Sequence, residues 1–300
     1  MIYNFEEPTR IGGATVYNVT PVRGGDAYLF VYDDVTFLFD SGFGFSSSKL
    51  HENIKNVLGE RNLDYVLLTH SHYDHALGSS HLNRVYSDCK VVGHEYAAKV
   101  MLKEGARSTM TRLDEAAREL HGFEEHFEDM ENLHIDIPVV DGQKIMLGKH
   151  EVEIVSLPGH TKDSIGYYFA ESKLMLGCET IGIYADVGVV MPSFLVSYEM
   201  TLNSIKRCGT YDIKYYMVPH QGVLIDDDFE TFIKGSIDSH IECAEMLVEA
   251  HKNGKSIDEM IQMFADRYYP EYVRVIYPPA AFAENVNIQI PMILRENGLI

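Results

Sequence analysis

Three histidines and an aspartate lie within six residues of this chain, at residues 70–75 (HSHYDH). Neutral imidazole and carboxylate groups are the ligands that suit zinc, iron and manganese. His70 and His72 can point to one side of a loop, while Asp74 and His75 turn to the other. A polar surface turn has no need of three histidines, so the motif predicts a site for two metal ions.

Two further histidines follow apolar segments through proline-containing turns. His160 lies in a Pro-Gly-His-Thr turn after the predicted strand 151–156, and His220 lies in a Pro-His-Gln-Gly turn after the predicted strand 215–218. Each histidine alone would more often be structural or exposed, but the repeated context favours a ligand. Loops at strand ends, positioned by a rigid scaffold, are where α/β proteins build their active sites.

The elements that must position these residues form a β-rich body followed by helices. Apolar runs bounded by glycine pairs predict strands near the N-terminus, and amphipathic patterns predict helices after residue 226. Pro291 is expected to end or kink the last helix. The expected strands are 14–19, 27–32, 35–39, 64–69, 85–92, 133–139, 144–147, 151–156, 165–170, 174–178 and 215–218, and the expected helices are 47–60, 94–132, 229–251, 256–268 and 280–296.

Composition limits the kinds of partner. The chain has 300 residues and 45 acidic against 25 basic side chains, a net charge of −20, which argues against binding a nucleic-acid backbone. Its four cysteines are widely spaced without a CxxC pair, as expected of a reduced protein. The N-terminus lacks the basic and apolar regions of a secretion signal, and no apolar stretch reaches about 18 residues. We expect a cytoplasmic protein that binds a small-molecule substrate, with no nucleic acid and no membrane.

Together these motifs resemble the metallo-β-lactamase fold superfamily of hydrolases, which includes glyoxalase II-type thioesterases, lactonases and phosphodiesterases. The resemblance covers roughly residues 12–225 and rests on Asp40 after a strand, the 70–75 loop and the turns at His160 and His220. It implies an α/β fold, an αββα sandwich at residues 1–225, with a C-terminal helical extension at 226–300 that packs on the same domain. That extension resembles the helices that cover the active-site mouth in quorum-sensing-associated thioesterases.

The resemblance also implies a ligand set for two divalent metal ions, with zinc preferred over iron or manganese. The family usually bridges the ions with the Asp of a Gly-Asp pair, whereas this chain has Gly177-Cys178-Glu179. Glu179 is favoured as the bridge because a carboxylate can bridge in the usual way, and Cys178 is the alternative. Asp40 would orient a ligating histidine. The implied ligands are His70, His72 and His160 for the first ion, and Asp74, His75 and His220 for the second.

The expected activity is that of a dinuclear metal-dependent hydrolase, in which a metal-bound hydroxide attacks a carboxylic thioester, ester or lactone. Asp74 would serve as the catalytic residue that holds the proton of the nucleophile. A phosphodiesterase on the same metals and a metal-bound regulatory protein with little turnover are the alternatives. Members of the superfamily that carry a di-iron redox centre replace the second histidine of the motif with Glu, and His72 argues against that class. Cys178 as a covalent nucleophile is disfavoured, because a thiol in an apolar strand stays neutral.

The expected substrate is partly apolar, because the helical segments are rich in aromatic and methionine side chains. Most of these side chains are expected in the core, and some should line a lid over the pocket. His94 and Tyr184 are candidates for substrate contact. The C-terminal helices could instead form a homodimer interface. The side chains considered for the lid are Met101, Met110, Phe123, Phe127, Phe264, Tyr268, Tyr269, Tyr272, Tyr277 and Phe282.

Overall fold

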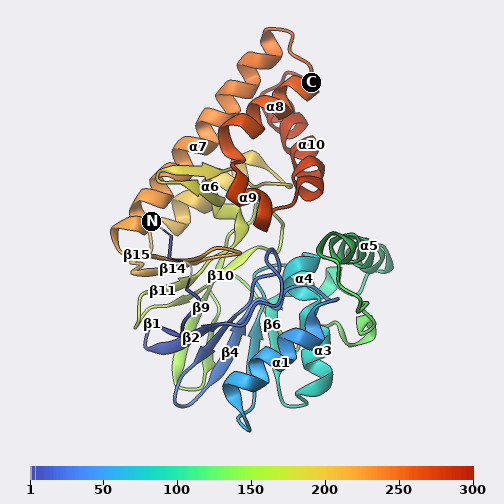
Figure 1. Ribbon diagram of the computed structural model, residues 1–300. Coiled ribbons are helices and arrows are strands. Elements are labelled where there is room, and N and C mark those ends of the chain that lie inside the picture. The colour runs from blue at the N-terminus through green and yellow to red at the C-terminus, as the bar shows by residue number, and fades with distance from the viewer. Residues whose placement is uncertain (1, 4) are drawn as a thin grey trace.

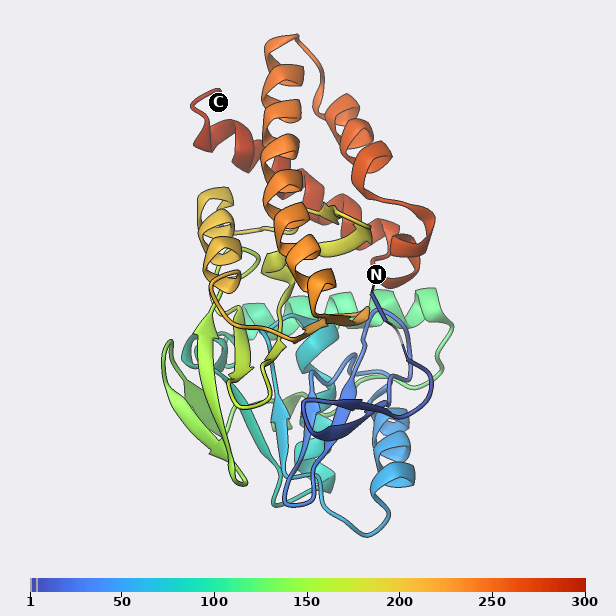
Figure 2. The same ribbon diagram turned by 90° about the vertical axis from the view of Figure 1, so that its left-hand side faces the viewer.

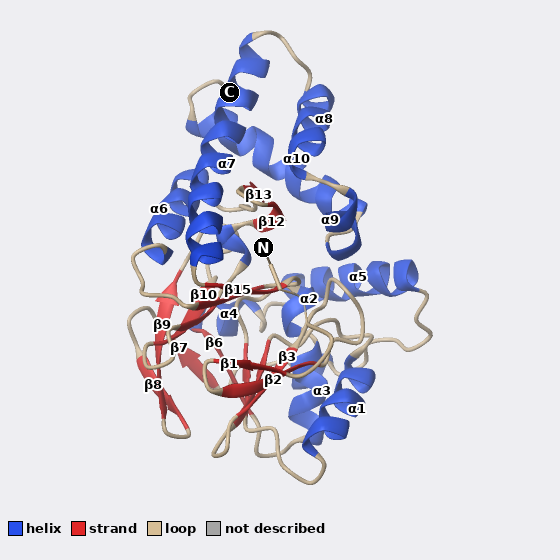
Figure 3. Ribbon diagram, turned by 60° about the vertical axis from the view of Figure 1, so that its left-hand side comes forward, coloured by secondary structure: helices blue, strands red, loops and turns tan. Residues whose placement is uncertain are grey.

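Two β-sheets face each other and are covered by helices on their outer sides (Figures 1 and 3). The computed structural model describes residues 2–3 and 5–300. A hydrophobic cluster between the sheets joins Phe30 and Phe37 of one sheet to Ile154 and Tyr167 of the other. The expected α/β fold with an αββα sandwich and C-terminal helices is confirmed.

The first sheet has the strand order β1 to β7. Its early strands are antiparallel hairpins, whereas β4, β5, β6 and β7 are parallel to one another. Helices α1 and α3 pack on its outer face through Leu50, Ile54 and Leu82. The bounds are β1 (Thr9–Ile11), β2 (Ala14–Asn18), β3 (Tyr28–Val31), β4 (Thr36–Phe39), α1 (Ser47–Leu58), β5 (Tyr65–Leu67), α2 (Tyr73–Ala76), α3 (Gly78–Val85), β6 (Lys90–His94), α4 (Glu95–Val100), α5 (Glu104–His121) and β7 (Ile137–Val139).

The second sheet has the order β15-β14-β11-β10-β9-β8. Strands β11 and β14 are parallel, and β9 runs in the same direction because both it and β11 are antiparallel to β10. Helix α6 covers the outer face through Ile205 and Cys208. The bounds are β8 (Lys144–Leu147), β9 (His150–Ser156), β10 (Ile165–Phe169), β11 (Leu174–Leu176), a small hairpin of β12 (Ile183–Asp186) and β13 (Val189–Met191), α6 (Tyr198–Cys208), β14 (Tyr215–Val218) and β15 (Gly222–Ile225).

The C-terminal helices stand above the sandwich and form a hydrophobic cluster of their own with β12 and β13 (Figure 2). Ser256 and Glu259 form a reciprocal capping box at the start of α8, which satisfies two backbone donors. The division of the chain at residue 225 stays a prediction. These helices are α7 (Asp227–Lys252), α8 (Ile257–Tyr268), α9 (Glu271–Ile276) and α10 (Pro279–Glu296).

Some sequence-based expectations for the elements are wrong. Pro291 does not end helix α10, which continues to Glu296, because the flanking Ile290 and Ile293 are buried in the C-terminal cluster and hold the segment in place; a kink at Pro291 stays a prediction. Val85 ends helix α3 instead of starting a strand, and β6 begins at Lys90. Helix α6, helix α9 and the β12–β13 hairpin were not expected. The expected helix 94–132 is divided into α4, α5 and a short 3₁₀ turn at Met130–Asn132.

A buried carboxyl on α5 anchors this helix to the loop that follows β4. Asp114 accepts hydrogen bonds from the backbone N–H groups of Gly44 at 2.8 Å and Phe45 at 3.0 Å. Burial raises the pKa of Asp114 to about 7 despite these bonds. The folded chain therefore keeps a proton there that an unfolded chain releases near pH 4. The stability gained from this proton is complete below about pH 4 and is lost as the pH rises through 7.

We therefore expect the unfolding free energy of the wild type to fall relative to that of Asp114→Asn between pH 4 and pH 7, by roughly 2–4 kcal/mol. Urea denaturation of both proteins at several pH values measures this difference. Only its change with pH is informative, because the Asn side chain also alters the two hydrogen bonds. A difference that stays constant over this range would contradict the prediction.

Candidate metal centre

The strand directions bring the chemistry-bearing loops to one rim of the sandwich. Strands β4 and β5 are parallel, and so are β9, β11 and β14 within the second sheet. Asp40 follows β4, and the 70–75 loop follows β5. His160, Glu179 and His220 follow β9, β11 and β14, respectively. Every one of these side chains therefore leaves the carboxyl end of its strand.

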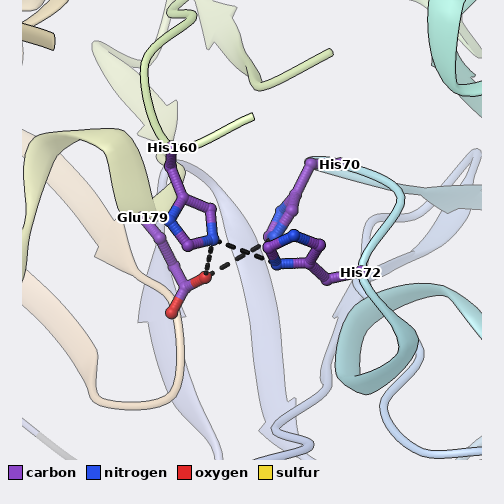
Figure 4. Close-up of side chains that lie close together, drawn as sticks. All are labelled: His70, His72, His160 and Glu179. Carbon is purple, nitrogen blue, oxygen red and sulfur yellow. Dashed lines mark hydrogen bonds and ion pairs between the residues drawn. The ribbon is translucent and has the colours of Figure 1, made fainter. Parts of the chain in front are cut away.

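The first group consists of His70, His72, His160 and Glu179, whose side chains point toward one another (Figure 4). His160 Nε2 lies 3.0 Å from His72 Nδ1 and 2.8 Å from Glu179 Oε2. His70 Nε2 lies 3.5 Å from the same carboxylate oxygen. One potential ligand atom from each side chain lies within 4.8 Å of the others, so the group could hold a single metal ion.

The second group consists of Asp74, His75 and His220. The Nε2 atoms of His75 and His220 lie 3.0 Å apart. Asp74 Oδ2 lies 3.8 Å from the first of these nitrogens and 3.9 Å from the second. All seven side chains that were expected as ligands are therefore brought together, with the five histidines and the aspartate divided between the groups as the resemblance implies.

The Glu179 carboxylate lies between the two groups. Its Oε2 atom is 3.7 Å from His75 Nε2, in addition to its contacts with the first group, and its Oε1 atom is 3.5 Å from His220 Nε2. The Cys178 thiol is buried instead in a hydrophobic cluster with Val155 and Tyr216, where burial raises its pKa to about 12. The geometry therefore favours Glu179 over Cys178 as a bridging group.

Several side chains lie against the histidine ring nitrogens that face away from the two groups. His75 Nδ1 donates to Asp40 Oδ2 at 2.8 Å, and Asp40 also accepts from the Thr69 backbone N–H at 2.8 Å. The His160 Nδ1 atom lies 2.9 Å from Ser193 Oγ. Such partners fix the ring orientation and increase the basicity of a ligating imidazole. Ser193 had not been recognised in the sequence.

A second outer carboxylate, Asp26, was also missed. It is buried, and its Oδ2 atom lies 3.8 Å from His220 Nδ1 and accepts from the Gly24 backbone N–H at 2.8 Å. Among the described residues, His220 Nδ1 has no hydrogen-bond partner. Asp26 therefore lies on the outer side of His220 as Asp40 lies on that of His75, but beyond hydrogen-bond distance. Its position after Gly24-Gly25 resembles an ordinary turn in the sequence, so no local signal marked it.

Replacing Asp26 with alanine should weaken metal binding in the second group by about 10–100-fold, the usual effect of removing such an outer partner. Titration of the metal-free protein with zinc, followed by calorimetry, measures this change. Asp33→Ala, at an exposed turn of the same sheet, is the control and should bind as the wild type does. Equal affinities for Asp26→Ala and the wild type would show that Asp26 does not position His220.

The electrostatics of the first group suit a cation. Burial and the other imidazoles hold the pKa of His70 well below its usual value, and burial together with His160 lowers that of His72 to about 3. Both rings are therefore neutral and keep a lone pair free for a metal ion. Burial alone would raise the pKa of Glu179, but the surrounding histidines, His160 first, hold it well below its usual value.

Unpaired polar atoms point to the same conclusion. Among the described residues, neither His70 Nε2 nor Glu179 Oε1 has a hydrogen-bond partner, although both atoms are buried. Buried polar atoms in proteins are nearly always paired. A divalent cation bound by these nitrogen and oxygen donors would satisfy both atoms, so the residues present fit such an ion.

The backbone of the ligand loops is constrained. His220 has a φ of 63° and Asp40 a φ of 52°. Residues other than glycine rarely adopt this backbone conformation, and it occurs preferentially at functional sites. Gly159, just before His160, has a φ of 147°, and a Cβ atom there would lie 2.1 Å from Thr201 Oγ1. Only glycine fits this turn, so the Pro-Gly-His sequence is required to place His160.

A cavity of about 670 Å³ opens above the two groups and is bounded by α5 on one side and by α9 and α10 on the other. Asp74, Glu179 and His160 form part of its lining. Helix α10 lines one wall of this cavity. The other lining residues used below are Tyr73, Tyr96, Val100, Ala106, Met110, Leu113, Lys162, Asp163, Leu195, Val196, Ile276, Tyr277, Ala281, Glu284 and Ile288.

Two predicted substrate contacts are wrong. His94 caps α4, where its Nδ1 accepts from the Tyr96 backbone N–H at 3.0 Å, and Tyr184 packs against Phe232; neither residue lines the cavity. Of the ten side chains considered for a lid, Met110 and Tyr277 line it. Most of the remaining eight are buried in the hydrophobic clusters, as the sequence analysis expected.

The fold and the site can be compared with known proteins. The family model of the metallo-beta-lactamase superfamily matches residues 20–220 of this chain. The chain belongs to this superfamily. The matched range contains all seven ligand candidates, Asp26 and Asp40, and it ends before α7.

The curated relatives are distant. The chain is similar to the hydroxyacylglutathione hydrolase of Rhodospirillum rubrum, with 27% identity over 119 residues, which are 40% of this chain and 34% of that protein. It is also similar to a metallo-beta-lactamase fold-containing protein of Sulfurisphaera tokodaii, with 24% identity over 222 residues, or 69% of this chain and 76% of the relative. The match to the hydrolase thus spans about a third of its length.

One solved structure resembles nearly the whole chain. A metallo-beta-lactamase family protein from Thermus thermophilus aligns over 94% of each chain, with a TM-score of 0.65 and 19% sequence identity. At this identity the likeness shows a shared fold, including most of the C-terminal helices. In the part of the chain that the structure describes, no helix is both long and apolar enough to span a membrane.

Proposed function

We propose that this superfamily member is a dinuclear metal-dependent hydrolase that cleaves a carboxylic thioester, ester or lactone. The observation that carries the proposal is the position of Glu179, whose two carboxylate oxygens lie within 3.7 Å of histidine nitrogens from both groups. A carboxylate shared in this way is suited to hold two cations close together. When bound, two divalent ions would supply a water molecule of lowered pKa. They would also supply the positive charge that polarises the carbonyl group of the substrate.

The ligand assignment in this proposal follows the two groups. His70, His72 and His160 would hold one ion, and Asp74, His75 and His220 would hold the other, with Glu179 shared between them. Zinc is the preferred metal, and iron or manganese would suit the same donors.

Asp74 is the residue proposed to accept and hold the proton of the attacking water. It lines the cavity, and 18% of its side chain is exposed, against 3% for Glu179. A carboxylate beside the attacking water can accept its proton. It is therefore both within reach of a substrate and able to take up a proton.

Tyr277 would contact the substrate from the opposite wall of the cavity. This tyrosine precedes α10, and the Asn285 side chain donates a hydrogen bond to its hydroxyl oxygen. Burial and the negative charges of Glu179 and Asp74 raise its pKa well above the usual value, so the hydroxyl stays protonated. A neutral hydroxyl beside the cluster is suited to donate a hydrogen bond to a carbonyl oxygen.

A substrate panel tests the proposal. Protein loaded with zinc, manganese or iron is assayed with p-nitrophenyl acetate, acetylthiocholine, γ-butyrolactone and bis-p-nitrophenyl phosphate. We expect turnover of at least one carboxylic substrate and little or none of the phosphodiester, because the site is acidic and the chain carries a net charge of −20. Turnover of the phosphodiester alone would contradict the proposed substrate class.

A further inference from the structure

The cavity extends beyond the metal cluster as an apolar groove between α5 and α10. One wall consists of Val100, Ala106, Met110 and Leu113, and Leu195 and Val196 also line the groove. The opposite wall consists of Ile276, Ala281 and Ile288. Removing an apolar chain from water into such surroundings is favourable by about 0.8 kcal/mol for each methylene group. The volume of about 670 Å³ lies within the range of small-molecule sites.

The groove offers few basic side chains to an anionic ligand. Of the described residues that line it, Lys162 is the one lysine or arginine, whereas Asp74, Asp163, Glu179 and Glu284 are acidic. Two divalent cations would offset the carboxylates beside the ligands, and Arg112, whose Nη1 atom lies 3.9 Å from Glu284 Oε1, offsets Glu284 at the opposite wall. A carrier with several phosphate or carboxylate groups would therefore meet no complementary cluster of basic side chains.

One wall of the groove is specific to the C-terminal part of the chain. Ile276, Ala281 and Ile288 all lie beyond residue 220, where the superfamily match ends. The other wall consists of Val100 at the end of α4 and of residues on α5, and the buried Asp114 anchors α5 to the loop that follows β4. The small side chains of Ala106 and Ala281, one on each wall, leave the space between the two helices open.

We infer that this groove binds an extended, unbranched acyl chain, so that the substrate is an uncharged acyl ester or lactone and not an acyl group on a polyanionic carrier. The inference rests on the proposed hydrolase function and adds its substrate class. Ala106 and Ala281 set the length of chain that fits. The scissile carbonyl then lies at the metal end of the cavity, and the chain extends between α5 and α10.

Binding and turnover are measured separately. Calorimetry follows the binding of butanamide and octanamide, neutral and slowly hydrolysed analogues, and p-nitrophenyl butyrate and octanoate report turnover by the metal-loaded protein. The variants are Ala281→Phe and Ala106→Phe, which fill the groove from either wall. The control is Ala283→Phe, an exposed position of α10 that does not line the cavity. Thermal unfolding checks that each variant folds. If one groove variant does not fold, the other groove variant provides the test.

We expect octanamide to bind the wild type at least about tenfold more tightly than butanamide. A groove variant should abolish this preference and lower kcat/KM for the octanoate ester by about tenfold or more, while Ala283→Phe leaves both unchanged. Equal binding of the two amides would overturn the inference, as would equal effects of the groove and control variants. Faster turnover of octanoyl coenzyme A than of the neutral octanoate ester would also overturn it.

These outcomes separate the two proposals. Chain-length-dependent binding without hydrolysis of any ester would support the groove and contradict the hydrolase function. Hydrolysis that is independent of chain length would support the hydrolase and contradict the groove.

Discussion

Replacement of Glu179 by alanine is expected to lower kcat/KM by at least about a hundredfold and to reduce the metal content of the protein. Among the described residues, the variant removes the one side chain whose oxygens approach histidines of both groups, His160 at 2.8 Å and His220 at 3.5 Å. Loss of an outer partner alone costs about 10–100-fold in affinity or activity, and loss of a shared ligand should cost more. Elemental mass spectrometry and steady-state kinetics on the same preparation measure both quantities.

The neighbouring residue provides a matched control. Cys178 directly precedes Glu179, but its side chain is fully buried in the hydrophobic cluster beneath α6. Cys178→Ala should destabilise the fold by about 1–2 kcal/mol through the small cavity it creates and should keep its metal and activity. If Cys178→Ala loses the metal while Glu179→Ala keeps it, the thiol is the bridge and the carboxylate assignment is wrong.

The second large effect is expected for Asp74→Asn. An asparagine keeps a similar shape and an oxygen that can approach a metal ion, but it cannot accept a proton as the carboxylate can. We expect kcat to fall by about 10²–10⁴-fold, the range for loss of a general acid–base group, with a smaller effect on metal content. Kinetics on protein of measured metal content tests this prediction.

A control for Asp74→Asn is Asp88→Asn, at an exposed turn between α3 and β6. This variant should behave as the wild type does. Full activity in metal-loaded Asp74→Asn would remove Asp74 from the proton-transfer role. A proportional loss of metal and activity would leave it the role of a ligand only.

Local sequence patterns predicted most of the candidate site. Four ligand candidates lie within the six residues of the 70–75 loop. They are close in space because they are close in sequence. His160 and His220 could be predicted because each follows an apolar strand through a proline turn. Parallel strands must end at the same edge of a sheet, and this geometry unites the loops.

The missed residues depend on contacts between distant parts of the chain. Asp26 meets His220 only after the two sheets have packed together, and Ser193 reaches His160 from the loop before α6. Tyr277 was grouped with other aromatic side chains, because nothing local separates a residue that lines the cavity from one in the core. Such pairings follow from tertiary packing and not from periodicity or spacing.

The differences between the expected and the observed elements have two kinds of cause, one local and one tertiary. Helix α6 has a sequence signal in Ser197, which caps it by accepting a hydrogen bond from the Met200 backbone N–H at 3.2 Å, and this signal was overlooked. At Pro291 the local rule predicts an end or a kink of the helix, and the helix does not end there because the neighbouring apolar side chains are buried. Tertiary contacts therefore decide the path of α10, which lines the cavity.

The metal content of the purified protein tests the central claim most directly. Protein prepared without chelator is analysed by elemental mass spectrometry, alongside His72→Ala, which lacks one ligand candidate of the first group. A dinuclear centre predicts about two divalent ions per chain in the wild type and clearly fewer in the variant. A wild type that carries no metal, and takes up none from added zinc, manganese or iron, would contradict a metal-dependent hydrolase.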